Sequence, residues 1–175
     1  SKILNIGEIK NWLHVGGLVE GEEHNFCLNT SSTHFAENAL GSLVVVKKVN
    51  CDVKKACESL QSWRPGIGRG SIKKINVRNV GLIELIDDGY NANPTSVSAA
   101  LETLSKSKSK RRIAILGDMK ELGPSEVDFH KSIASLASMA KVDCVYTVGP
   151  LMKNLHNSLP KEKRGQHFKN SLEVV

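Results

Sequence analysis

The stretch LIELIDDGYNANPTSVSAALETL, residues 82–104, decides the fold that we predict for this chain. Its apolar first half predicts a strand that ends at Asp87 and Asp88. A short polar loop follows, and Pro94 opens a predicted helix with Asn93 as its N-cap. In an open α/β sheet, ligands bind beyond the carboxyl ends of the strands. The two aspartates therefore stand where such a sheet would hold a ligand.

The rest of the chain from residue 71 onward repeats this alternation of strands and helices, which is typical of a largely parallel sheet. The predicted fold class is therefore α/β, a Rossmann-like domain over residues 71–175. We predict strands near 72–78, 81–87, 112–117, 143–148 and 166–168, and helices over 94–105, 124–140, 151–158 and from Asn170 onward.

The segment before this domain reads differently. Residues 1–32 contain short apolar stretches broken by Gly and charged residues, and we expect β-structure or loop without a self-sufficient core. Thr33 can cap a helix over 34–49, and a second helix begins at Asp52. We expect the first helix to expose an apolar face, and the chain to self-associate through it, unless residues 1–32 cover that face.

A connector separates the two parts. The sequence RPGIGRG, residues 64–70, is rich in Gly and Pro, so the second helix ends there and a domain boundary follows. We predict one domain over 1–70 and another over 71–175.

Composition excludes several classes of protein. With 40% hydrophobic and 24% charged residues, the chain has neither disorder-like nor membrane bias. No apolar run approaches the roughly 20 residues that span a bilayer, and no signal peptide is evident, so we expect a cytoplasmic protein.

The four cysteines show no zinc spacing. The net charge of +6 suits an anionic small substrate, and the basic run at 106–112 has no aromatic residue to stack on a base, which disfavours nucleic acid.

The residues at and after the aspartate pair Asp87–Asp88 can be interpreted in two ways. Asp87 and Asp88 can hold a ribose hydroxyl, a cationic group or a metal ion, while the amides of Asn91 and Asn93 can grip a peptide-like substrate. Alternatively, Asn93 is only a helix cap and Asp88 only a turn residue, since Asp and Asn are ordinary turn formers.

A second strand and loop follow in RIAILGDMKELG, residues 112–123. Asp118 lies at the tip of this loop and Glu121 shortly after it, and two such loops would line one crevice. His130 lies in the next predicted helix, where a histidine is either a catalytic base or, more commonly, a surface or satisfied core residue.

Three runs together resemble the Mur ligases, in particular the branch that adds D-alanyl-D-alanine. IDDGYNANPTSVSAAL and IAILGDMKELG resemble that branch's hallmark runs, and THFAENALGSLVVVKKVNCDVKKACESLQSWRPGIGRG resembles the end of its central ATP-binding domain. The resemblance extends from about residue 33 to residue 149. It implies that residues 1–70 are a partial central domain and residues 71–175 a C-terminal domain, truncated at its end.

The resemblance also implies a reaction. Such ligases use ATP and Mg²⁺ to phosphorylate the carboxylate of UDP-N-acetylmuramoyl-tripeptide, and the amine of D-alanyl-D-alanine then attacks the acyl phosphate. Phosphorylation supplies a leaving group, and cations offset the charge on the transferring phosphate.

Site roles follow from position in the motifs and are implied by the resemblance alone. No catalytic residue and no metal ligand is assigned. The residues that would bind ATP are His34 and Asn38 near the adenine, Arg69 near the phosphates and Asp88 at the ribose. The residues that would bind the substrates are Asp87, Tyr90, Asn91 and Asn93. A supporting or D-alanyl-D-alanine-side role would belong to Asp118, Glu121 and His130.

The chain also departs from the family pattern. Phe35 and Gly89 stand where the family usually has Asn and Ser, and no GxxxxGK[ST] phosphate loop is present. We therefore expect ATP and Mg²⁺ to be bound mainly by a missing part of the central domain, and the chain alone to be inactive. The alternatives are a folylpolyglutamate-synthase-like ligase and a non-catalytic nucleotide- or peptide-binding module from a shortened gene.

Overall fold

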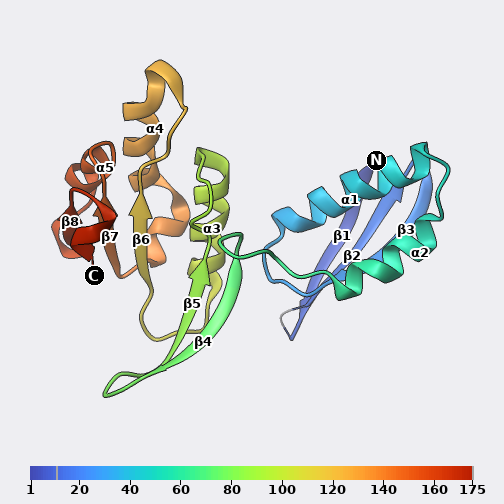
Figure 1. Cartoon of the computed structure of the whole chain (residues 1–175), viewed down its shortest axis with the longest axis horizontal. Coiled ribbons are helices and arrows are strands. Elements are labelled where there is room, and N and C mark those ends of the chain that lie inside the picture. The colour runs from blue at the N-terminus through green and yellow to red at the C-terminus, as the bar shows by residue number, and fades with distance from the viewer. Residues whose placement is uncertain (11, 175) are drawn as a thin grey trace. The chain divides into compact units, whose positions relative to one another are not determined.

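The computed structural model describes residues 1–10 and 12–174, which form two compact units, Ser1–Gly66 and Ile67–Val175. Unit 1 contains a small sheet with two helices, and unit 2 contains a hairpin, a parallel sheet and three helices (Figure 1). In the sequence, the boundary between the units falls after Gly66, inside the predicted connector and a few residues before the predicted boundary after residue 70.

The sheet of unit 1 is an antiparallel meander. Its strands β1 (Lys2–Ile9), β2 (Trp12–Val19) and β3 (Glu22–Leu28) lie in the order β1-β2-β3. Side chains alternate across β2, so Leu13 and Val15 are buried on one face, at 1% and 2% exposure. The strands contribute to a core that the following helices complete, so residues 1–32 contain the predicted β-structure but not a core of their own.

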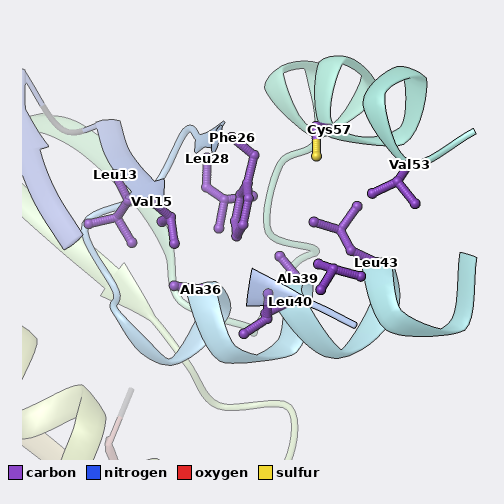
Figure 2. Packing of buried hydrophobic residues seen from close by; sticks show 11 residues of the cluster. Leu13, Val15, Phe26, Leu28, Ala36, Ala39, Leu40, Leu43, Val53 and Cys57 are labelled. Atoms are coloured by element: carbon purple, nitrogen blue, oxygen red, sulfur yellow. The ribbon is translucent and has the colours of Figure 1, made fainter. Parts of the chain in front are cut away.

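Two helices cover that apolar face. Helix α1 (His34–Lys48) packs Ala36, Leu40 and Leu43 against the sheet, as Figure 2 shows. Helix α2 (Val53–Ser59) closes the cluster, and a 3-10 turn, Leu60–Ser62, follows it. The strands of residues 1–32 therefore cover this face of the first helix, so the condition under which we expected it to be exposed is not met.

The hairpin of unit 2 comes next in the chain. Strands β4 (Ser71–Val77) and β5 (Gly81–Asp87) match their predicted positions to within a residue. They pair antiparallel with each other, however, in a two-stranded sheet separate from the parallel one. Including them in a largely parallel sheet was wrong, because the three residues between them permit only a hairpin and no crossover.

The parallel sheet contains β6 (Ile113–Gly117), β7 (Cys144–Val148) and β8 (Arg164–Phe168), in that order. Helices α3 (Pro94–Lys106) and α5 (Met152–Ser158) contribute to the core beside it. The α/β prediction is confirmed here, with strand and helix bounds close to those expected. The core comprises Val97, Leu101, Ala114, Met119, Ile133, Met139, Val142, Val145, Met152, Leu155 and Leu159.

The predicted helix over 124–140 is wrong, because that segment is broken. Only α4 (Glu126–Ser132) is α-helical, and 3-10 turns flank it at Gly123–Ser125, Ile133–Ser135 and Ala137–Lys141. Leu136 is extended, with ψ at 135°, which interrupts the helical path. A 3-10 turn, Ser171–Val174, also replaces the helix expected from Asn170. None of the helices in the described part of the chain is long and apolar enough to span a membrane.

Lys163 stabilises the broken segment. Its Nζ donates to the carbonyl oxygens of Met139, Ala140 and Val142 at 2.7–2.8 Å. Carbonyls at the end of a helical turn have no partner within the turn, and a cation satisfies them well. This lysine lies more than twenty residues away in sequence, which explains why the local pattern missed the break.

Candidate functional site

The end of β5 is joined to the connector by backbone hydrogen bonds. Gly70 N donates to Asp87 O at 2.8 Å, and Tyr90 N donates to Gly68 O at 3.0 Å. Gly68 has φ +71°, and a Cβ there would lie 3.0 Å from Tyr90 N, so the close approach requires glycine. The connector therefore runs directly along the loop that carries the predicted site residues.

This pairing brings Arg69 over Tyr90. The guanidinium carbon lies 4.3 Å from the centroid of the phenol ring, within the range of a cation–π interaction. Arg69 is exposed and Tyr90 is 69% exposed, while Asp87 and Asp88 are half-buried. A cation, an aromatic face and two carboxylates at one strand end suit a ligand with phosphate and hydroxyl groups.

Asn93 serves as the N-cap of α3, in a reciprocal capping box. Its Oδ1 accepts a hydrogen bond from Ser96 N at 2.9 Å, and Asn93 N donates to Ser96 Oγ at 3.0 Å. The cap interpretation is therefore confirmed for Asn93. The cap uses the side-chain oxygen, so the side-chain NH₂ is still able to donate, and both Asn93 and Asn91 are exposed.

The second loop, Asp118–Leu122 after β6, uses its polar groups to hold the fold. Asp118 Oδ1 accepts a hydrogen bond from Met152 N at 2.7 Å, so this carboxylate lies at the first turn of α5. Gly149 has φ +103°, and a Cβ there would lie 2.5 Å from the Asp118 carboxylate. Asp118 thus links the ends of β6 and β7.

His130 fixes the same loop from α4. Its ring is fully buried, with Nδ1 2.6 Å from Glu126 O and Nε2 accepting from Met119 N at 3.0 Å. These partners define a neutral imidazole that donates through Nδ1 and accepts through Nε2. With both nitrogens engaged and no exposure, this histidine matches the satisfied core alternative. Glu121 is exposed in the same loop, with φ +63°.

His34 and Asn38 lie in unit 1, one turn apart on α1. His34 Nδ1 is buried and has no hydrogen-bond partner among the described residues, which is uncommon for a buried nitrogen. The His34 ring lies 4.0 Å from the ring of Phe35, which in turn contacts Trp63 at 4.8 Å. The Phe35 ring therefore contacts both the His34 ring and the Trp63 ring. The sequence motifs did not point to Trp63.

A further polar cluster between α5 and the parallel sheet was also missed. The buried Thr147 Oγ1 lies 3.0 Å from His167 Nδ1 and 3.4 Å from His156 Nδ1. Burial, and then the positive charge of Lys153, lowers the pKa of both histidines. Across residues 1–10 and 12–174, no three His, Cys, Asp or Glu side chains converge on a metal site.

The parallel sheet β6-β7-β8, with helices packed beside it, makes unit 2 an α/β domain. The family description "Mur ligase, glutamate ligase domain" matches residues 75–175, and the chain therefore belongs to the Mur ligase family.

Individual relatives agree with this family. The "UDP-N-acetylmuramoyl-tripeptide--D-alanyl-D-alanine ligase" of Rickettsia prowazekii is 32% identical over 142 residues, which are 81% of this chain and 30% of that protein. The crystal structure of MurF from Acinetobacter baumannii matches 98% of this chain and 36% of its own length, with a TM-score of 0.80 and 21% identity. MurF from Thermotoga maritima, in complex with ADP, covers 98% of this chain and 43% of its own length, with a TM-score of 0.72 and 20% identity.

The structural matches extend over both units, so unit 1 as well as unit 2 has its fold in these proteins. The chain spans about 30% of the length of the curated relatives that it matches.

Proposed function

We propose that this chain acts as the C-terminal part of a cytoplasmic, ATP-dependent ligase that joins D-alanyl-D-alanine to UDP-N-acetylmuramoyl-tripeptide in peptidoglycan precursor synthesis. In this proposal residues 1–70 end a central ATP-binding domain, and residues 71–175 form the C-terminal domain. Family membership and the name of the Rickettsia prowazekii relative support it. The observation that carries it is the exposed pair Arg69 and Tyr90 beside two strand-end aspartates.

Arg69 is the proposed phosphate ligand. Its guanidinium lies against the ring of Tyr90, and the residue is exposed to solvent. An oriented guanidinium binds phosphate oxygens by paired hydrogen bonds and offsets charge on a phosphate in transfer. Asp88 would accept hydrogen bonds from the ribose hydroxyls. The T. maritima structure contains ADP, which supports a nucleotide as the ligand.

His34 and Asn38 are the proposed adenine contacts. The free Nδ1 of His34 beside the Phe35 ring offers one hydrogen-bonding atom and one aromatic surface, which are the two features a purine uses.

Asp87, Tyr90, Asn91 and the free NH₂ of Asn93 are proposed to contact the reacting peptides, because amide and carboxylate groups pair with peptide groups and with an ammonium. Asp118 and His130 are proposed to support this region through the hydrogen bonds already described, and Glu121 to contact D-alanyl-D-alanine.

Mg²⁺ is proposed to be bound mainly by the part of the central domain that carries the phosphate loop, and no step is derived through it. The chain also lacks a phosphate loop, so we expect no ATP hydrolysis by these 175 residues alone.

The test is phosphate release by the cellular polypeptide that carries these residues, with ATP, Mg²⁺ and UDP-N-acetylmuramoyl-tripeptide, with and without D-alanyl-D-alanine. Release that requires the dipeptide is expected. Arg69→Ala should lower the rate at least tenfold, while Arg78→Ala, an exposed arginine at the far end of the hairpin, should leave it unchanged. No dipeptide-dependent release would overturn the proposal in favour of a binding module.

A further inference from the structure

The outer face of the unit 1 sheet carries a small hollow. Leu13 and Val15 point into the core, so His14 and Gly16 belong to the opposite face of β2. Gly16 pairs with Asn5 on one side and Asn25 on the other, and a Cβ at Gly16 would lie 2.8–3.1 Å from their amide groups. Gly16 therefore leaves room for the side chains of Asn5 and Asn25, which both line the hollow.

The hollow has a volume of about 210 Å³ and is open to solvent. Three side-chain amides line it, those of Asn5, Asn25 and Gln61. Each of these amides both donates and accepts hydrogen bonds, as a peptide group does. The hollow is smaller than the roughly 300 Å³ of a drug-sized pocket, so it suits one end of a flexible ligand that carries amide groups.

A thiol and an imidazole also line the hollow. Cys27 lies directly across from His14 in the β2–β3 pair, and its Sγ is 3.3 Å from His14 Nδ1. Cys27 is partly exposed and His14 is exposed, so both are accessible from the hollow. An imidazole in hydrogen-bond contact can accept the thiol proton, and the thiolate is the reactive nucleophile.

We propose that Cys27 and His14 form a thiol-exchange site for low-molecular-weight disulfides that carry amide groups. The Cys27 proton passes to His14 Nδ1, and the thiolate attacks one sulfur of the incoming disulfide. A new S–S bond joins Cys27 to that half of the molecule as the original S–S bond breaks. The other half leaves as a thiolate and takes the proton, so Cys27 is oxidised and the leaving half is reduced.

The other cysteines provide internal controls. Cys51 is exposed, and its only described hydrogen bond is a long one to Val49 O at 3.9 Å. Cys57 is buried, and burial raises the pKa of its thiol. If exposure alone controlled reactivity, Cys51 would react faster than the less exposed Cys27. The proposal requires the reverse order.

The experiment treats the 175-residue chain with oxidised glutathione at pH 7 and follows each thiol by peptide mass spectrometry, since every cysteine falls in a separate tryptic peptide. Cys27 should form the mixed disulfide at least tenfold faster than Cys51. His14→Gln should lower the Cys27 rate about tenfold and leave the Cys51 rate unchanged. Equal rates at Cys27 and Cys51, or no effect of His14→Gln, would overturn the site.

A second variant tests the amide-lined hollow. Asn25→Ala should slow the reaction of Cys27 with oxidised glutathione severalfold, yet leave its alkylation by iodoacetamide unchanged, because iodoacetamide needs only the thiolate. If Asn25→Ala slows the reaction of Cys27 equally with both reagents, Asn25 acts through the fold, and the hollow does not bind the amide groups of the disulfide. Urea unfolding of both variants verifies that the sheet is intact. The outcome is independent of the ligase proposal, since no nucleotide or Mur substrate is present.

Discussion

The two strand-end loops of unit 2 resemble each other in sequence and differ in the use of their polar groups. Each follows an apolar strand, begins with aspartate and leads toward a helix. After β5, the side chains of Arg69 and Tyr90 are exposed, and their described contact is with each other. After β6, the Asp118 carboxylate binds the α5 backbone, and the buried His130 binds the Met119 amide.

This difference teaches that a strand–aspartate–loop pattern does not by itself identify a binding residue. A polar group that already has a buried partner contributes to the free energy of folding, and its removal leaves an unsatisfied atom. An exposed polar group contributes little to folding and is available to a ligand. Substitutions in the two loops and at their partners should therefore differ in their effects on stability and on ligand binding.

His130→Ala should be the most destabilising. It creates a cavity and removes the partners of Met119 N and Glu126 O, so we expect a loss of about 3 kcal/mol in the free energy of unfolding. Urea unfolding followed by circular dichroism measures this loss. The neighbouring exposed Lys131→Ala is the matched control and should cost less than about 0.5 kcal/mol. Full stability with lost ligand binding would mean that His130 belongs to the site.

Gly149→Ala should follow, at about 2 kcal/mol, because the new Cβ is strained at φ +103° and collides with the Asp118 carboxylate. Gly117→Ala, where a Cβ meets nothing within 4 Å, should be neutral or stabilising in the same unfolding assay. Combining Gly149→Ala with Asp118→Ala should cost less than the sum of the two single changes, since one change relieves the collision of the other. Strictly additive losses in the free energy of unfolding would contradict the contact between residue 149 and the Asp118 carboxylate.

Asn93→Ala should cost about 1 kcal/mol through loss of the N-cap of α3. Asn93→Asp keeps the capping oxygen and should retain stability to within about 0.5 kcal/mol. The aspartate lacks the NH₂, so calorimetric titration of the active ligase with D-alanyl-D-alanine separates the two roles. Unchanged affinity in Asn93→Asp would leave Asn93 as a cap only.

Arg69→Ala should change stability least, by less than about 0.5 kcal/mol, because an exposed cation–π pair contributes little. ADP affinity of the active ligase should nevertheless fall about tenfold, or about 1.4 kcal/mol, by isothermal titration calorimetry. Tyr90→Phe preserves the ring and should match wild type in both measurements. A destabilised Arg69→Ala with normal ADP affinity would reverse the contrast between the loops.

The local sequence determined the elements of this protein well where a short-range signal exists. The Asn93–Pro94 pair defines the start of α3, and Gly117–Asp118 defines the end of β6, because caps and turns depend on neighbouring residues. The motif order around both loops also led to the Mur ligase family, which the family match confirms.

What only the tertiary structure decided depends on residues far apart in the chain. Three features follow from distant partners: the pairing of β4 with β5 alone, the burial of α1 by the first three strands, and the break after α4. At the break, for example, Lys163 Nζ donates a hydrogen bond to Met139 O. The same holds for the two loops. The Asp118 carboxylate and the His130 ring accept hydrogen bonds from the backbone of Met152 and Met119, whereas the described contact of the Arg69 side chain is with the exposed ring of Tyr90. Sequence specifies which groups a loop offers, and the fold decides which of them are left for a ligand, because burial and hydrogen bonding are properties of the packed chain.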